Sequence, residues 1–129
     1  MEHKQKILVV EDVYFNQVLI ETLLTDWGYT AILASNTSEA LEALKNEMPD
    51  IIILDLMLPG TDGFHFLKEK SSMNNTTPVI VVSAKTDTNT FIKAKEYGVA
   101  EYITKPYNSI DLKNKLNNYL NQQEQKSCS

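Results

Sequence analysis

The chain has 129 residues, which is enough for one domain with a single hydrophobic core. Its 43% hydrophobic and 22% charged residues are ordinary for a soluble globular protein, and no apolar run approaches the roughly 20 residues that cross a membrane. A net charge of −5, without a single arginine, argues against a nucleic-acid surface.

The first half of the chain alternates between short apolar runs and segments with helical periodicity. Its predicted elements are a strand over Ile7–Val10, a helix over Tyr14–Trp27, a strand over Thr30–Ala34 and a helix between Asn36 and Pro49. Gly28 is the expected C′ residue of the first helix, directly after its C-cap. Asn36 is the expected N-cap of the second, with Glu39 completing a capping-box pattern. The predicted inner face of this second helix contains Ala40, Leu41, Leu44 and Met48.

The second half of the chain begins with its most apolar run, Ile51–Leu54, which ends in Asp55. This run shows no polar–apolar alternation, which is typical of a central strand in a parallel sheet covered on both faces. Pro59 and Gly60 are expected to turn the chain after it. The predicted elements are strands over Ile51–Asp55, Val79–Ser83 and Glu101–Thr104, and helices over Gly63–Lys70, Asp87–Tyr97 and from Asn108 onward. The last helix has an apolar face of Leu112, Leu116, Tyr119 and Leu120.

Five strands that alternate with five helices predict an α/β fold, a doubly wound (βα)5 three-layer sandwich. The first, third and fourth strands are the most apolar and belong in the middle of the sheet, whereas the second and fifth suit its edges. With right-handed crossovers, the predicted parallel order is 2-1-3-4-5. Ligands of such sheets bind where the strand order reverses, here between the first and third strands.

The carboxyl-terminal end of the chain is polar and rich in glutamine. We therefore predict one domain over residues 1–120 and a flexible polar tail over residues 121–129. The only cysteine, Cys128, lies in this tail and cannot form an internal disulfide, which fits a reducing cytoplasm.

Three acidic residues meet at the predicted reversal point. Glu11 and Asp12 follow the first strand, and Asp55 ends the third. Two carboxylates about 4 Å apart repel by about 1 kcal/mol in water and about 4 kcal/mol at an effective dielectric constant of 20. A small hard cation removes this cost, and Mg²⁺ accepts one or two carboxylates together with phosphate oxygens. The sequence therefore predicts a magnesium site here.

A hydroxyl and an ammonium group end two neighbouring strands. Ser83 ends the fourth strand, and Lys105 follows the fifth. Opposite a carboxylate-bound metal, these groups form a cradle for a phosphoryl group, in which the lysine neutralises charge and the serine donates a hydrogen bond. Asp55 leaves the most buried strand and is the predicted nucleophile, since aspartyl phosphates are known covalent intermediates.

Four motifs in this order and at these separations resemble the response-regulator receiver domain of two-component signal transduction. They are Leu8–Asp12, Ile53–Gly63, Pro78–Ala84 and Tyr102–Pro106, and the resemblance covers about residues 6–120. Each motif alone is moderately specific, but their combination is very specific. The resemblance implies a chemotaxis-regulator-like, flavodoxin-like fold.

The resemblance also implies roles for the acidic residues. Asp55 is the expected phosphoacceptor. Glu11 and Asp12 are expected to hold Mg²⁺ together with Asp55 and the backbone carbonyl of Met57, and Mn²⁺ is expected to substitute for it.

By the same resemblance, Ser83 and Lys105 bind the phosphoryl group, and the bond between Lys105 and Pro106 is cis. Tyr102 matches the aromatic switch residue, which turns inward when Ser83 moves toward the phosphate. The face built from the fourth helix, the fifth strand and the fifth helix then signals to an output protein.

The resemblance implies that the phosphoryl donor is a phosphohistidine of a sensor histidine kinase or His-phosphotransfer protein, which docks near the first helix. The chain would phosphorylate and dephosphorylate itself without a separate substrate, and small donors such as acetyl phosphate should also work. No direct nucleic-acid binding and no membrane insertion are expected.

Three alternatives remain open. The chain is either a free-standing receiver or one excised from a hybrid sensor histidine kinase or multidomain regulator; its first methionine favours a native N-terminus. A Mg²⁺-dependent aspartyl phosphohydrolase is less favoured, because Met57 stands where such enzymes carry a second aspartate. A flavodoxin-type redox module needs a hydroxyl- and glycine-rich phosphate loop after the first strand, where this chain has Glu11–Tyr14.

Overall fold

The computed structural model describes residues 4–58 and 63–128, with side chains up to Leu120. Within these residues lie the strands β1 (Lys6–Val10), β2 (Thr30–Ala34), β3 (Ile51–Leu54), β4 (Val79–Ser83) and β5 (Glu101–Thr104). The helices are α1 (Tyr14–Asp26), α2 (Thr37–Glu47), α3 (Gly63–Ser72), α4 (Thr88–Glu96) and α5 (Ser109–Cys128). Three of the strands, β2, β4 and β5, have the predicted bounds. The turn predicted at Pro59 and Gly60 lies outside the described residues.

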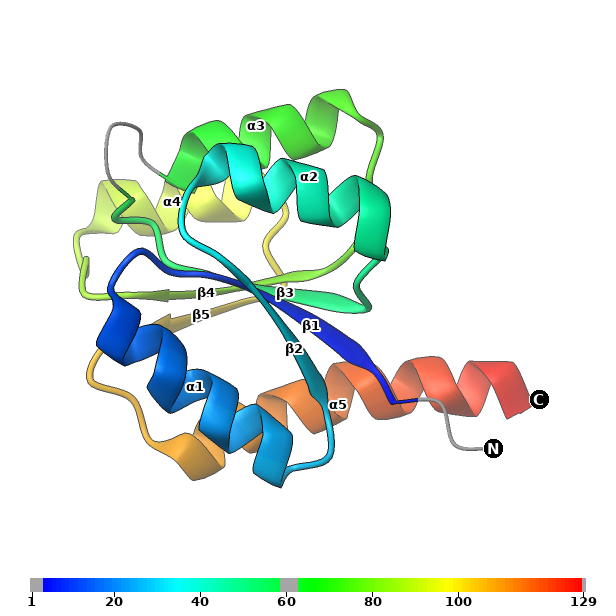
Figure 1. Cartoon of the computed structure of the whole chain (residues 1–129). Coiled ribbons are helices and arrows are strands. Elements are labelled where there is room, and N and C mark those ends of the chain that lie inside the picture. The colour runs from blue at the N-terminus through cyan, green and yellow to red at the C-terminus, as the bar shows by residue number, and fades with distance from the viewer. Residues whose placement is uncertain (1–3, 59–62, 129) are drawn as a thin grey trace.

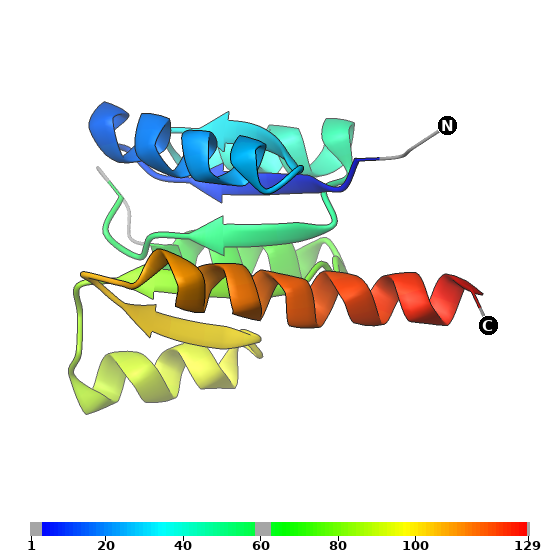
Figure 2. The same ribbon diagram turned by 90° about the horizontal axis from the view of Figure 1, so that it is seen from below.

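The strands form one parallel sheet in the order β2-β1-β3-β4-β5, as predicted. Helices α1 and α5 cover one face of this sheet, and α2, α3 and α4 cover the other (Figure 1). Figure 2, seen from below, places α1 and α5 in front of the strands. Right-handed crossovers put the helices on opposite faces because the chain reverses its direction of travel across the sheet between β1 and β3. The predicted three-layer sandwich is thereby confirmed.

The core consists of two apolar clusters, one on each side of the sheet. All residues of β3 and β4 are buried, which confirms that their continuous apolar runs form central strands. Successive side chains point to opposite faces, so Ile53 packs in the cluster with α1 and α5, and Leu54 in the cluster with α2 and α3. The three central strands therefore hold the residues that follow them rigidly at one edge of the sheet.

Local signals for helix ends in the sequence are confirmed at three helices. The Asn36 side chain accepts a hydrogen bond from the Glu39 backbone N–H at 2.9 Å, and the Glu39 carboxylate accepts one from the Ser35 N–H at 2.7 Å. Asn108 caps α5 by accepting a hydrogen bond from the Ile110 N–H at 2.8 Å. Gly28 follows α1 with φ +93°, a conformation that glycine adopts without strain.

The prediction that Met48 belongs to the inner face of α2 is wrong. The helix ends at Glu47, and Met48 is its C-cap in the left-handed conformation, with φ 49°. This change in backbone direction turns the Met48 side chain away from the sheet, where 78% of its surface is exposed. Pro49, which directly follows, is buried.

Helix α5 continues to Cys128, so the backbone of residues 121–128 is helical where the sequence indicated a flexible tail. The mobility of this segment and the domain boundary at residue 120 stay predictions. Within the described parts of the chain, none of the helices combines the length and the hydrophobicity needed to span a membrane.

Candidate metal centre

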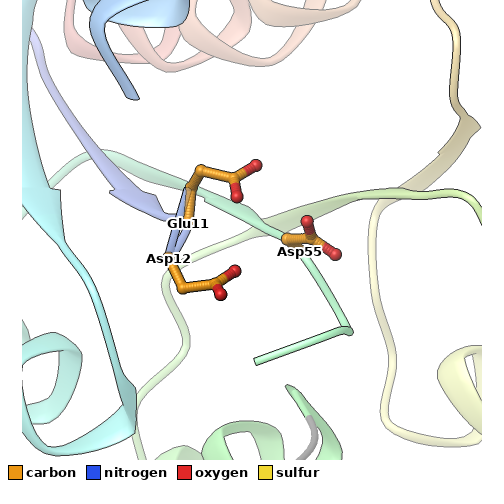
Figure 3. Close-up of side chains that lie close together, drawn as sticks. All are labelled: Glu11, Asp12 and Asp55. Carbon is orange, nitrogen blue, oxygen red and sulfur yellow. The ribbon is translucent and has the colours of Figure 1, made fainter. Parts of the chain in front are cut away.

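The three acidic residues predicted from the sequence converge at the carboxyl-terminal edge of the sheet. Glu11 and Asp12 directly follow β1, and Asp55 directly follows β3, which pairs with β1 so that Val10 lies beside Leu54. A hydrogen bond of 3.0 Å from the Asp55 N–H to the Val10 carbonyl extends this pairing to the acidic residues. Each carboxylate offers one oxygen within 4.8 Å of the other two, and the three side chains lie close together (Figure 3).

Two of these carboxylates are buried and share one cation. Glu11 is 6% exposed and Asp55 8% exposed, whereas Asp12 is exposed. The Lys105 ammonium lies 3.1 Å from Glu11 Oε1 and 2.8 Å from Asp55 Oδ2. Burial acts to lower the pKa of Lys105, but hydrogen bonds and charges of Asp55 and Glu11 outweigh it and raise this pKa above its usual value. Lys105 is therefore a cation at neutral pH.

The remaining oxygen of each buried carboxylate accepts a backbone hydrogen bond. The Val13 N–H donates to Glu11 Oε2 at 3.1 Å, and the Met57 N–H donates to Asp55 Oδ1 at 2.9 Å. These bonds fix the orientation of both side chains before any ligand arrives. Asp12 has no hydrogen-bond partner among the described residues and is free to reorient.

The donor set fits a small hard cation. Three carboxylates against one ammonium leave two formal negative charges uncompensated, and every candidate ligand atom is oxygen. Mg²⁺ and Mn²⁺ prefer such ligands, whereas Zn²⁺ sites usually contain histidine or cysteine. The acidic cluster of Glu11, Asp12 and Asp55 is therefore suited to holding a divalent ion of the magnesium type.

Replacing Lys105 by methionine is expected to lower the free energy of unfolding in EDTA by about 2 kcal/mol. Breaking a fully buried ion pair costs about 3–5 kcal/mol, and the partial exposure of Lys105 reduces this cost. Added Mg²⁺ should stabilise the Lys105→Met variant more than the wild type, since the ion restores the missing positive charge. Thermal unfolding with and without Mg²⁺ measures both effects, with Lys105→Arg as the charge-retaining control. Equal stability of the methionine variant and the wild type in EDTA would contradict the expectation.

Ser83 and Tyr102 meet at the backbone of the loop that follows β4. Ser83 is fully buried, and its hydroxyl accepts a hydrogen bond from the Lys85 N–H at 3.2 Å. The Tyr102 hydroxyl donates to the Lys85 carbonyl at 2.7 Å. Burial raises the pKa of Tyr102, and the charges of Asp87 and Asp55 add to this rise, so the hydroxyl remains a protonated donor. Lys85 thus connects the two predicted switch side chains.

Lys105 and Ser83 are neighbours at the ends of adjacent strands. The Lys105 N–H donates to the Ser83 carbonyl at 2.8 Å, which continues the pairing of β5 with β4. The peptide bond between Lys105 and Pro106 is cis, as expected. The structure therefore brings Ser83 to the same edge of the sheet as Asp55 and Lys105.

A largely apolar groove of about 670 Å³ opens beside the metal centre, between α1 and the segment that connects β5 to α5. Leu19 and Leu23 line it from α1, and Tyr107 lines it from the opposite side, while Asp55 and Lys105 contribute to its polar end. Further exposed apolar side chains on α1 and at the start of α5 are Tyr14, Phe15, Val18 and Ile110. An apolar partner surface placed in this groove would reach Asp55.

Sequence reasoning missed two residues that shape the site. Gln17 is buried on α1, and its side chain donates a hydrogen bond to the Glu11 carbonyl. The sequence pattern that could have revealed it is a polar residue three positions before Ile20, on the apolar face of the predicted helix. Gly63 begins α3 and donates to the Leu56 carbonyl at 2.7 Å, and a Cβ there would lie 2.7 Å from the Leu56 Cα. Gly63 ends the motif Ile53–Gly63, but no local pattern shows that its lack of a side chain is what allows its close approach to Leu56.

A family model of the response regulator receiver domain matches residues 7–117. The chain belongs to this family. This receiver domain is 34% identical over 116 residues to the probable transcriptional regulator ycf27 of Guillardia theta, a match that covers 90% of the chain and 45% of that protein. It is 29% identical over 116 residues to the sporulation initiation phosphotransferase F of Bacillus subtilis (strain 168), a match that covers 90% of the chain and 94% of that protein.

Among solved structures, the signal receiver domain of a signal transduction histidine kinase from Syntrophus aciditrophicus has a TM-score of 0.83 at 28% identity, with 92% of this chain and 91% of that one covered. The receiver domain spans about half the length of the ycf27 relatives, but nearly all of phosphotransferase F. The family therefore contains both free-standing receivers and receivers that are parts of longer proteins.

Proposed function

We propose that this receiver domain accepts a phosphoryl group from a phosphohistidine onto Asp55 in a two-component phosphorelay. The observation that carries the proposal is the convergence of Glu11, Asp12 and Asp55 within 4.8 Å, with Lys105 2.8 Å from Asp55. Asp55 Oδ2 attacks phosphorus as the phosphorus–nitrogen bond to the histidine breaks, and the electron pair of that bond leaves with the imidazole nitrogen, which takes a proton from water. Lys105 balances the negative charge that develops on the phosphoryl oxygens.

Glu11, Asp12, Asp55 and the Met57 carbonyl would hold Mg²⁺, or Mn²⁺ in its place. When bound, the ion neutralises phosphoryl oxygens and screens the carboxylates from the incoming charge. The Met57 N–H and the Lys105 ammonium already hold Asp55 in a fixed orientation, which lowers the entropy that the reaction must lose. Because the chain supplies both the nucleophile and its cradle, it phosphorylates and dephosphorylates itself and has no separate substrate.

The phosphoryl group adds a charge of about −2 beside Ser83. The Ser83 hydroxyl, which accepts from the Lys85 N–H at 3.2 Å, would donate its own proton to a phosphoryl oxygen, and a movement of Ser83 toward that oxygen would lengthen its bond with Lys85. Lys85 and Tyr102 would move with Ser83, because the Tyr102 hydroxyl donates to the Lys85 carbonyl. The movement would reach α4, because the ring centroids of Tyr102 and Phe91 are 5.5 Å apart. Phosphorylation would thereby shift the population of the α4–β5–α5 face toward a signalling form.

The groove beside α1 supports docking of a helix that carries the phosphohistidine, from a sensor histidine kinase or a His-phosphotransfer protein. Its apolar walls suit the apolar face of such a helix, and its polar end contains Asp55 and Lys105. The α4–β5–α5 face would bind an output protein. The net charge of −5 favours a protein partner over nucleic acid, and we place the domain in the cytoplasm without membrane insertion.

A second possibility is a receiver module within a hybrid sensor histidine kinase or a multidomain regulator. The similarity to the receiver domain of a histidine kinase, and to regulators about twice the length of this chain, favours it. The phosphoacceptor chemistry is the same in both cases. They differ in whether the signal passes to a separate protein or to a covalently attached domain.

Incubation with acetyl phosphate and Mg²⁺ is expected to attach a single phosphoryl group to the chain. Hydroxylamine should remove it, because hydroxylamine cleaves acyl phosphates but leaves phosphate esters of serine and threonine intact. Intact-mass spectrometry before and after hydroxylamine measures both. A hydroxylamine-resistant product would contradict the role of Asp55, and rapid hydrolysis of small phosphomonoesters would instead favour the aspartyl phosphohydrolase.

A further inference from the structure

Gln17 is a buried polar residue on the face of α1 that packs against the sheet. It is 7% exposed, and the other buried residues of this helix are Ile20 and Leu24. Burying an amide side chain costs free energy unless hydrogen bonds replace its contacts with water. The partners of Gln17 therefore indicate what this residue holds in place.

The Gln17 side-chain amide nitrogen donates two hydrogen bonds that join two loops. One goes to the Glu11 carbonyl at 2.6 Å and the other to the Ser35 hydroxyl at 3.0 Å. The last residue pair of β1 and β2 is Val10 with Ala34, and Glu11 follows Val10. The Glu11 carbonyl therefore lies outside the regular hydrogen bonding between these strands. Within the strands, such carbonyls accept hydrogen bonds from the backbone N–H groups of a neighbouring strand. For Glu11, the Gln17 side-chain amide takes the place of that donor.

The hydrogen bond from Gln17 to the Glu11 carbonyl restrains the peptide unit between the two acidic residues. This carbonyl and the Asp12 N–H belong to one planar peptide unit, so fixing one end of the unit also restricts the backbone of Asp12. The other polar groups of Glu11 are already bonded: its N–H donates to the Ala34 carbonyl, and its carboxylate accepts from Val13 and Lys105. Asp12 has no comparable restraint of its own among the described residues.

We propose that Gln17 is a positioning residue of the metal centre, which holds the Glu11–Asp12 peptide so that both carboxylates face the ion. The proposal rests on the proposed function in that it assigns Mg²⁺ to this cluster. It acts through Glu11 and Asp12, since Gln17 itself offers its amide nitrogen to the backbone. Residues that orient metal ligands typically change metal affinity by roughly 10–100-fold when they are lost.

The test compares Gln17→Met with Ser35→Ala. Methionine keeps the length and unbranched shape of glutamine but removes both donors, whereas Ser35→Ala removes a partner of Gln17 and leaves the Glu11 carbonyl bonded. Isothermal titration with MgCl₂ should show about 10-fold weaker binding for Gln17→Met and unchanged binding for Ser35→Ala. At saturating Mg²⁺, the rate of labelling of Gln17→Met by acetyl phosphate should return to that of the wild type.

A metal-free measurement separates this proposal from the proposed function. In EDTA, hydrogen exchange at the Val13 amide, which donates to Glu11 Oε2, should accelerate in Gln17→Met but not in Ser35→Ala. Faster exchange in Gln17→Met alone supports the positioning role even if the wild type accepts no phosphoryl group. Equal Mg²⁺ affinity and equal Val13 exchange in the two variants, while the wild type is labelled normally, would overturn the role of Gln17 and leave the proposed function standing.

Discussion

Asp55→Asn is expected to reduce labelling by acetyl phosphate and Mg²⁺ to background. A carboxamide has no anionic oxygen to attack phosphorus, but it has nearly the same shape as the carboxylate and still offers an oxygen to the Met57 N–H. The variant loses the ion pair between Lys105 and Asp55 but keeps the one between Lys105 and Glu11, so it should still fold while it loses the chemistry. Intact-mass spectrometry after a fixed incubation measures the loss, and circular dichroism checks the fold.

Asp26→Asn is the matched control for this experiment, because Asp26 ends α1 on the exposed surface, outside the acidic cluster. It carries the same chemical change and should be labelled as efficiently as the wild type. Undiminished labelling of Asp55→Asn would remove Asp55 from its role as phosphoacceptor. Loss of labelling in both variants would point to a general effect of charge on the reaction and count against a specific site.

Asp12→Asn is expected to weaken Mg²⁺ binding, because a direct ligand of the ion loses its charge. Loss of a residue that only orients a ligand weakens metal binding by roughly 10–100-fold, and the loss of a ligand should cost at least as much. In EDTA the same variant should be as stable as the wild type or slightly more stable. Asp12 is exposed and has no hydrogen-bond partner among the described residues, and its removal relieves repulsion from two buried carboxylates.

Isothermal titration with MgCl₂ and thermal unfolding in EDTA measure the two effects of Asp12→Asn separately. Asp26→Asn again serves as the control, since it removes the same charge at a distance from the cluster. An unchanged affinity for Mg²⁺ would exclude Asp12 as a ligand. A marked fall in thermal stability in EDTA would show that Asp12 has a structural role that the hydrogen bonds do not reveal.

The strands and their order followed from local features of the sequence. The runs Ile51–Leu54 and Val79–Ser83 are apolar without interruption, and only a central parallel strand places both of its faces in a core. The helix ends were less predictable where packing overrides local signals. Met48 continued the apolar spacing of α2, yet the backbone turns into the left-handed conformation before reaching it.

The members of the acidic cluster were predictable because each directly follows a strand, and parallel strands bring these positions together. Lys105 was predicted at the same edge, as a residue that binds the phosphoryl group, but its direct ion pairs with Glu11, across 94 positions of sequence, and with Asp55, across 50, were not. The hydrogen bond from Gln17, near the start of α1, to the Glu11 carbonyl was not predicted either. The need for glycine at position 63 likewise becomes clear only from its packing against the backbone of Leu56.

The amino-acid sequence alone thus determined the layers, the strand order and the edge of the sheet at which the acidic residues gather. Apolar periodicity and the ends of strands depend only on residues that are close together in the sequence. Only the tertiary structure decided that Glu11 and Asp55 are buried around one lysine while Asp12 remains exposed. It also decided that a helix amide holds the peptide between Glu11 and Asp12. These features depend on distances of about 3 Å between side chains far apart in the sequence, and such distances exist only once the sheet has formed.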